Sequence, residues 1–190
     1  MIDRSEKSFA IGERRVGLGE PVFVIAEAGV NHDGSVAKAH ALIDAAADAA
    51  ADAVKFQTFI PDALVTRSAP AAEYQQETVG AKDQHSMLSD LTLPDLAWAE
   101  LAAHAQDRNI AFLSTPFDPR SLALLLQVGV PAVKISSGDI SNHVLLRAVA
   151  ASGLPVIVSS GASTFEDVER ALAVFDPSAD IAVLHCVTAY

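Results

Sequence analysis

The sequence predicts an α/β fold made of repeated strand–helix units, the arrangement that closes into a (β/α)8 TIM barrel. Short apolar runs alternate along the chain with longer amphipathic stretches rich in alanine and leucine. The apolar runs are nearly continuous, as in parallel strands that are covered on both faces. About six such runs are present, at residues 21–26, 53–57, 110–114, 132–136, 155–159 and 181–185.

The pattern divides the chain into an N-terminal segment, residues 1–20, that can form a short β-hairpin, and a barrel domain, residues 21–190. A closed eight-stranded barrel usually takes about 250 residues. With six strand–helix units in 190 residues, we expect the barrel to be incomplete at its C-terminus. Two explanations stay open: the chain is a fragment of a longer protein, or another element covers the gap.

Helix boundaries follow from capping residues. Asp118, followed by proline, is expected to begin one helix, and Gly129 to end it. Ser141 can begin the next helix, which Gly153 ends. The segment Ser163–Glu166 has the spacing of a capping box.

The second unit differs, because about 35 residues separate its strand from a helix that begins near Pro94. A connection of that length in a compact domain is usually a functional loop. A surface excursion that contacts no ligand is an equal alternative for any single residue. The polar residues of this loop that could meet a ligand are Arg67, Glu73, Tyr74, Lys82, Asp83 and His85.

Composition excludes several functional classes. The net charge of −11 argues against general affinity for nucleic acid, which requires clustered lysine and arginine. Neither a membrane span nor a secretory signal is evident, so we expect a cytoplasmic protein. The single cysteine, Cys186, lies in an apolar run and is expected to be a buried, inert thiol.

Polar side chains follow nearly every predicted strand, where parallel β-α proteins bind their ligands. Lys55 and Lys134 end strands two apart, and hydroxyls accompany them at Thr115, Ser137 and Ser159. Ammonium groups beside hydroxyls suit a small dianion that carries phosphate or carboxylate. Lysines that only extend to solvent, and a Schiff-base lysine, are the alternatives.

Two carboxylates stand at the same predicted edge. Glu27 follows the first strand and can bind sugar hydroxyls or transfer protons; Asp139 follows the fourth and could instead cap the next helix. His32 is expected to stabilise its turn rather than bind a ligand. His185 could be a core histidine within the last strand.

Taken together, five motifs resemble the N-acetylneuraminate (sialic acid) synthase family, which includes legionaminate and pseudaminate synthases. The resemblance covers almost the whole chain from about residue 9. It implies a transferase of carbohydrate biosynthesis, in which C3 of phosphoenolpyruvate attacks the aldehyde of an N-acetylhexosamine, water adds at C2, and phosphate leaves by C–O cleavage. The five motifs are residues 26–34, 55–58, 114–117, 134–139 and 184–190.

The resemblance also implies residue roles. Glu27 and Asp139 would be catalytic, and Glu27 and Tyr190 would meet the sugar. Asp139 stands where several members have glutamate, which hints at a different amino sugar; Thr188 replaces a common asparagine and carries no role. The residues expected around phosphoenolpyruvate are Lys55, Gln57, Thr115, Lys134, Ser137 and Ser159.

Features outside this chain are implied as well. The family uses a divalent metal, Mn²⁺ or Mg²⁺, whose histidine ligands would lie beyond residue 190, and its members form homodimers in which a further small domain completes the partner's site. The chain alone is therefore expected to lack the metal site. The competing hypotheses are another phosphoenolpyruvate-dependent 3-deoxy-ulosonate synthase, which needs a second phosphate site, and a catalytically silent fragment that keeps the phosphate-binding rim.

Overall fold

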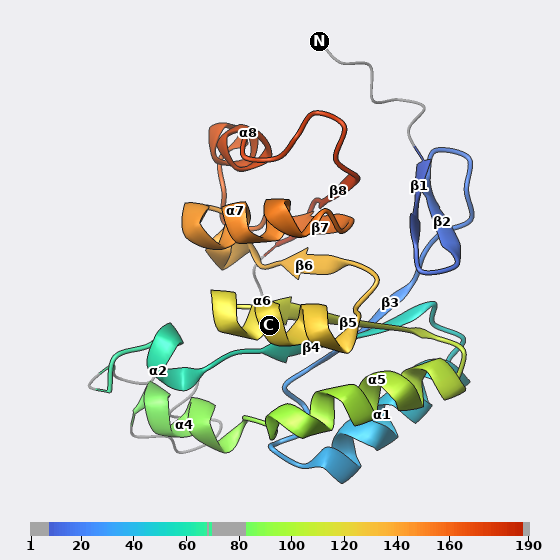
Figure 1. The fold of residues 1–190 in the computed structure, drawn as a ribbon, viewed down its shortest axis with the longest axis vertical. Helices are drawn as coiled ribbons and strands as arrows, with labels where there is room; N and C mark the ends of the chain where they lie inside the picture. The colour runs from blue at the N-terminus through green and yellow to red at the C-terminus, as the bar shows by residue number, and fades with distance from the viewer. Residues whose placement is uncertain (1–7, 68, 70–82, 188–190) are drawn as a thin grey trace.

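A parallel sheet forms the centre of the molecule (Figure 1). The computed structural model describes residues 8–67, 69 and 83–187. Within them the six strands of the sheet pair in sequence order, each with the next, as in a (β/α)8 barrel that has six of its units. The strands are β3 (Ile25–Gly29), β4 (Ala53–Thr58), β5 (Ala111–Pro116), β6 (Val133–Ile135), β7 (Val156–Ser159) and β8 (Ile181–Leu184).

Helices connect successive strands and cover the outer face of the sheet. The described part of the long connection after β4 contains two short helices, so the prediction of one extended loop was incomplete. Three of its predicted ligand-binding residues, Glu73, Tyr74 and Lys82, lie outside the described residues. The helices are α1 (Val36–Asp48), α2 (Pro61–Leu64), α4 (Gln84–Asp90), α5 (Asp95–Asp107), α6 (Pro119–Val128), α7 (His143–Ser152) and α8 (Phe165–Leu172), with a 3₁₀ helix, η1 (Ser137–Asp139), after β6.

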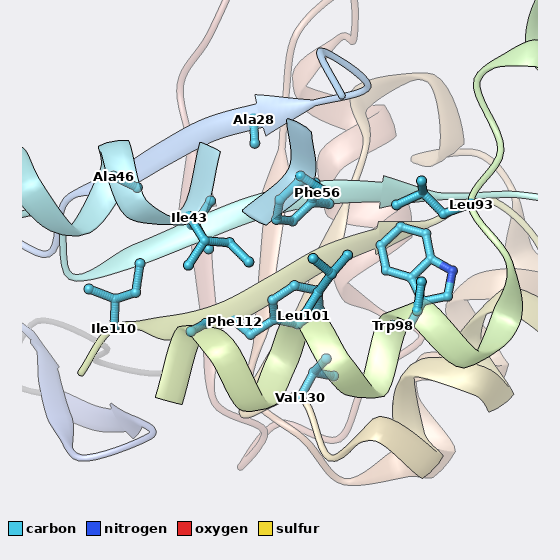
Figure 2. Packing of buried hydrophobic residues seen from close by; sticks show 14 of the residues in the cluster. Ala28, Ile43, Ala46, Phe56, Leu93, Trp98, Leu101, Ile110, Phe112 and Val130 are labelled. Atoms are coloured by element: carbon cyan, nitrogen blue, oxygen red, sulfur yellow. The ribbon is translucent and has the colours of Figure 1, made fainter. Parts of the chain in front are cut away.

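The outward-facing side chains of the strands pack against these helices. Phe56 of β4 stacks on Phe112 of β5 with ring centroids 5.5 Å apart, and Trp98 of α5 contacts both rings edge-on. Figure 2 shows this cluster between the first strands and helices α1 and α5. A second cluster, which includes Ile135 and Leu145, joins β6 and β7 to α7 and α8. Burial of these apolar faces supplies the main driving force for folding.

A β-hairpin, β1 (Ser8–Ile11) and β2 (Arg14–Gly17), lies at the end of the sheet where the strands begin (Figure 1). Its Phe9 and Ile11 are buried against the inward-facing side chains at that end. Arg14 forms an ion pair with Asp52, the residue that precedes β4. The second carboxylate oxygen of Asp52 accepts a hydrogen bond from the Val24 amide at 2.7 Å, which ties the hairpin, β3 and β4 together.

The predicted helix boundaries are partly confirmed. Asp118 caps α6 through the Ser121 amide, and Gly129 and Gly153 end α6 and α7 in the left-handed conformation. Two caps were predicted one residue too early. Asn142, not Ser141, caps α7, and the capping box of α8 pairs Thr164 with Asp167 rather than Ser163 with Glu166. In each case the neighbouring polar residue makes the local hydrogen bond.

The turn between β3 and α1 is fixed by His32 and Gly34. His32 is buried, and its Nδ1 accepts a hydrogen bond from the Gly34 amide at 3.1 Å, so its predicted turn-stabilising role is confirmed. Gly34 has φ +70°, and a Cβ here would collide with the carbonyl oxygen of Asp90, the last residue of α4. Only glycine lets these two backbones approach so closely.

None of the helices in the described part of the chain is long and apolar enough to cross a membrane.

Candidate active site at the carboxyl ends of the strands

An open cavity of about 190 Å³ lies inside the curve of the sheet. Side chains alternate between the two faces of a strand, so the residues two apart on β4, β5, β6 and β7 point inward. The structure brings together seven of the predicted site residues around this space. These are Glu27, Lys55, Gln57, Thr115, Lys134, Ser137 and Ser159.

Lys55 is buried on β4 and makes two side-chain contacts in the cavity. Its Nζ lies 2.9 Å from Oε2 of Glu27 on β3 and donates a hydrogen bond of 3.2 Å to Oγ1 of Thr115 on β5. The pair is asymmetric, because the Lys55 side chain is 8% exposed and that of Glu27 is 50% exposed. The ammonium is thus fixed in the wall, and the carboxylate faces the open space.

Among the described residues, no carboxylate forms an ion pair with Lys134. Its Nζ donates to Oγ of Ser159 at 2.5 Å and to the Ile135 carbonyl oxygen at 2.9 Å, and both acceptors are neutral. The pKa of Lys134 is lowered to about 8, chiefly by burial and also by the nearby charge of Lys55, while Glu27 and Cys186 oppose the change. The charge of Lys55 therefore acts on the pKa of Lys134 across the cavity.

A β-bulge aims Glu27 into the cavity. The pairing of β3 with β4 shifts register between Glu27 and Gly29, which is typical of strands beside active sites. Gly29 has φ +53°, and a Cβ there would lie 3.3 Å from Oε1 of Glu27 and 3.7 Å from Nε2 of Gln57. Glycine therefore leaves room for both polar side chains.

Asp139 is not among the residues that line the cavity. It ends η1, is half-buried, and accepts a hydrogen bond of 3.2 Å from Nδ2 of Asn142, the residue that caps α7. Burial raises the pKa of the Asp139 carboxyl, and the hydrogen bond from Asn142 opposes this. The other predicted sugar-binding residue, Tyr190, lies outside the described residues.

Two predictions near the end of the chain were wrong. Cys186 is partly exposed and lines the cavity, so it is not the buried thiol that its apolar run suggested. His185 follows β8 and is exposed, so it is not a core histidine. Strand β8 ends at Leu184, and its own last two residues are already exposed, so the apolar run is not covered at this end.

Several wall residues were not predicted. Ile25, Phe117, Ser136, Leu184 and Val187 also line the cavity. Alternation of inward positions could have identified Ile25, which lies two residues before Glu27, and Phe117, which lies two residues after Thr115. The Glu27–Lys55 ion pair could not be read from the sequence, because it depends on the register between two strands.

Among residues 8–67, 69 and 83–187, no three histidine, cysteine or carboxylate side chains are grouped to bind a metal ion. No chemical step is therefore assigned to a metal within this part of the chain. The residues that line the cavity supply two ammonium groups, one exposed carboxylate and the four hydroxyls of Thr115, Ser136, Ser137 and Ser159. Such a set can hold a small dianion and place a proton-transfer group beside it.

Comparison with known proteins agrees with this geometry. Residues 42–190 match the NeuB family. The chain belongs to the NeuB family. It is 41% identical over 172 residues to the N,N'-diacetyllegionaminic acid synthase of Campylobacter jejuni, an alignment that covers 88% of the chain and 52% of that protein. It is 36% identical over 175 residues to the N-acetylneuraminate-9-phosphate synthase of Drosophila melanogaster, covering 91% of the chain and 47% of that protein.

Solved structures of NeuB-like proteins confirm the fold. The N-acetylneuraminic acid synthetase of Leptospira borgpetersenii, crystallised with citrate, superposes with a TM-score of 0.83 at 34% identity, covering 97% of the chain and 60% of that structure. A 3-deoxy-D-arabino-heptulosonate 7-phosphate synthase of Thermotoga maritima superposes with a TM-score of 0.63 at 12% identity, covering 93% and 55%, a likeness of fold alone. The chain spans about half the length of the relatives it matches.

Proposed function

We propose that the chain forms the phosphoenolpyruvate-binding part of a NeuB-family synthase that makes a nonulosonic, sialic-type acid. The reaction joins C3 of phosphoenolpyruvate to the aldehyde carbon of an N-acetylated amino sugar. Water adds at C2, the C2–O bond to phosphate breaks, and inorganic phosphate leaves. The single observation that carries the proposal is the pair of buried lysines, Lys55 and Lys134, whose ammonium groups share one cavity with hydroxyl partners.

In this proposal the two lysines hold the two anionic groups of phosphoenolpyruvate. Lys55 acts with Thr115 and Gln57, and Lys134 acts with Ser137 and Ser159. A fixed ammonium stabilises the negative charge that collects on the departing phosphate, and it needs no reorganisation during the reaction. The apolar surroundings of both stems strengthen this attraction.

Glu27 is the proposed acid–base group. Its carboxylate is exposed to the cavity, and an anion that binds Lys55 would compete with it for the same ammonium. The released carboxylate could then bind the sugar or move the proton of the attacking water. Asp139 is proposed as the second acid–base group, and its raised pKa suits a carboxyl that must donate a proton.

The complete enzyme carries further proposed parts. Tyr190 would contact the sugar, and histidines beyond residue 190 would hold Mn²⁺ or Mg²⁺, which would polarise the aldehyde. We also expect a cytoplasmic homodimer. The first step, the binding of phosphoenolpyruvate, is assigned in this proposal to residues of β4 to β7 and η1.

The binding step is tested by titrating the chain with phosphoenolpyruvate in a calorimeter. We expect one site per chain, weakened in Lys134→Met and unchanged in Lys38→Met, a control lysine that pairs with Asp33 on the surface. Absence of binding to the unaltered chain would contradict the proposal.

The reaction is tested in the longer enzyme with phosphoenolpyruvate that carries ¹⁸O in its C–O–P bridge and a panel of N-acetylated amino sugars. The proposal expects the label in the released phosphate, because the C–O bond breaks. Label retained in the sugar acid would refute this mechanism. Phosphate release only with a phosphorylated sugar that carries no N-acetylamino group would favour the alternative class of 3-deoxy-ulosonate synthases.

A further inference from the structure

The inward-facing side chains of the sheet form two successive layers of opposite character. The lower layer, nearest the start of the strands, is apolar, and the upper layer carries the polar groups of the cavity. Each upper residue lies two positions after a lower one on the same strand or its lead-in. The pairs are Ala53 and Lys55, Leu113 and Thr115, Ala132 and Lys134, and Ile157 and Ser159.

Register places the two layers in direct contact. Lys55 pairs with Leu113 across β4 and β5, and Lys134 pairs with Ile157 across β6 and β7. Partners in a parallel ladder present their side chains to the same face. The methylene stem of each lysine therefore rises beside an aliphatic residue of the lower layer.

The strands alone do not fill the lower layer. Ala53 and Ala132 have short side chains, and Phe9 and Ile11 of the hairpin pack in the same apolar cluster as these alanines. Phe9 is 8% exposed and Ile11 is 2% exposed. The Arg14–Asp52 ion pair holds the hairpin against the start of β4. The hairpin thus completes an apolar floor under the two lysines.

We propose that Phe9 and Ile11 are positioning residues of the anion site: they keep water out of the floor and so hold Lys55 and Lys134 in a low-dielectric wall. This inference rests on the proposed binding of phosphoenolpyruvate. The attraction between an ammonium and an anion grows as the local dielectric constant falls. A hairpin residue that never touches the ligand would then determine how strongly the ligand is held.

The pKa of Lys134 shows whether the floor excludes water, because burial is the main cause of the lowered pKa. The charged or titratable groups that face it are Lys55 from β4, Glu27 from β3 and Cys186 after β8. The described floor residues are all apolar and add no charge. Water admitted from below would therefore raise this pKa toward the ordinary lysine value of 10.5.

The test measures the titration of Lys134 without ligand, by pH-dependent labelling with an amine reagent and mass spectrometry. We expect Phe9→Ala to move the labelling midpoint upward by about one pH unit. Phe9→Leu should restore it. Leu18→Ala, a matched truncation just after β2 at a residue that is 77% exposed, should leave it unchanged. Ile11→Val provides a milder second variant of the floor.

A second readout is the affinity for phosphoenolpyruvate across pH. In Phe9→Ala we expect weaker binding at pH 7, by several-fold, with the decline at alkaline pH displaced upward. A purely structural defect would weaken binding at every pH and leave the decline in place. A folded Phe9→Ala and a folded Ile11→Val that both keep the original labelling midpoint would overturn the inference. Failure of the unaltered chain to bind phosphoenolpyruvate would instead overturn the proposed function.

Discussion

Lys55 and Lys134 stand on alternate strands of one sheet, point into one cavity and are equally buried, yet their surroundings differ. Lys55 has a carboxylate, Glu27, at 2.9 Å. Lys134 has only neutral oxygens, the Ser159 hydroxyl and the Ile135 carbonyl. The positive charge of the first lysine is balanced by a carboxylate in direct contact, and that of the second has no such contact among the described residues.

This difference suggests separate roles in binding. A buried ammonium without a counter-ion is costly, and it is compensated when an anion arrives. An anionic ligand therefore stabilises the charge of Lys134 more than that of Lys55, because Lys55 only exchanges one carboxylate for another anionic group. The exchange frees Glu27 at the moment when the second substrate needs it. Five experiments test this contrast.

The largest effect is expected at Glu27. Glu27→Gln in the longer enzyme should reduce turnover by about 100-fold or more, because it removes the proposed acid–base group. The melting temperature should fall only slightly, since the Glu27 side chain is half exposed and glutamine keeps an oxygen that can accept a hydrogen bond from Lys55. Steady-state phosphate release and thermal unfolding measure the two quantities. Turnover close to that of the unaltered enzyme would remove Glu27 from the mechanism.

The next effect separates the two lysines in binding. Lys134→Met should weaken phosphoenolpyruvate binding by about 2–5 kcal/mol, the usual result of removing one partner of a buried charge pair. Lys55→Met should cost less, because Glu27 already offsets part of that charge. Calorimetric titration of both variants gives the order. Equal losses would show that the carboxylate does not distinguish the lysines.

A smaller effect is expected from pH. Because the pKa of Lys134 is lowered to about 8, its charge is lost as the pH rises through that value. Affinity for phosphoenolpyruvate should then fall about tenfold between pH 7 and 9. Glu27→Gln should move the decline to lower pH, since the Glu27 charge raises this pKa. A decline that is the same in Lys134→Met would assign it to another group.

The same pKa predicts how stability changes with pH. Between about 8 and 10.5 the unfolded chain binds a proton at Lys134 that the folded chain does not. The free energy of unfolding from this group therefore rises with pH across that window. Denaturant melts of the unaltered chain and Lys134→Met, compared at pH 7.5 and 10, isolate the contribution as a difference that the variant lacks.

The smallest effect is expected at Gly29. Gly29→Ala should cost about 1 kcal/mol of stability, because alanine is strained at φ +53°. Its Cβ would also press on Oε1 of Glu27, at 3.3 Å, and weaken the Glu27–Lys55 pair. Chemical denaturation measures the first effect. A Lys134 labelling midpoint that moves down, as in Glu27→Gln, would show that the carboxylate had withdrawn from the cavity.

The sequence predicted the repeated units and most of the upper layer of the site. Lys55, Thr115, Lys134 and Ser159 were identified because each stands at the carboxyl end of an apolar run. Periodicity identifies such positions well, since every parallel strand ends at the same edge of the sheet. The position of Asp139 was harder to predict, because it lies in the 3₁₀ helix after β6, where the side-chain alternation of the strand no longer applies.

Features that depend on contacts between distant segments were not predictable. The burial of Phe9 and Ile11 under the site requires the hairpin to fold back onto Ala53 and Ala132. Nothing in the sequence around these two alanines indicates that a distant segment packs on them. The exposure of Cys186 and His185 depends on where the last strand ends. The capping residues of α7 and α8 were one residue from their predicted positions, because adjacent polar residues compete for the same role.

The close approach of Gly34 to Asp90 has a consequence for motion within the molecule. Gly34 follows the strand that carries Glu27, and Asp90 ends the helix at the far end of the long connection that begins after Lys55 and Gln57. Their backbones touch with no side chain between them. Because no side chain separates them, a movement of α4 toward this turn would displace the backbone of Gly34 directly.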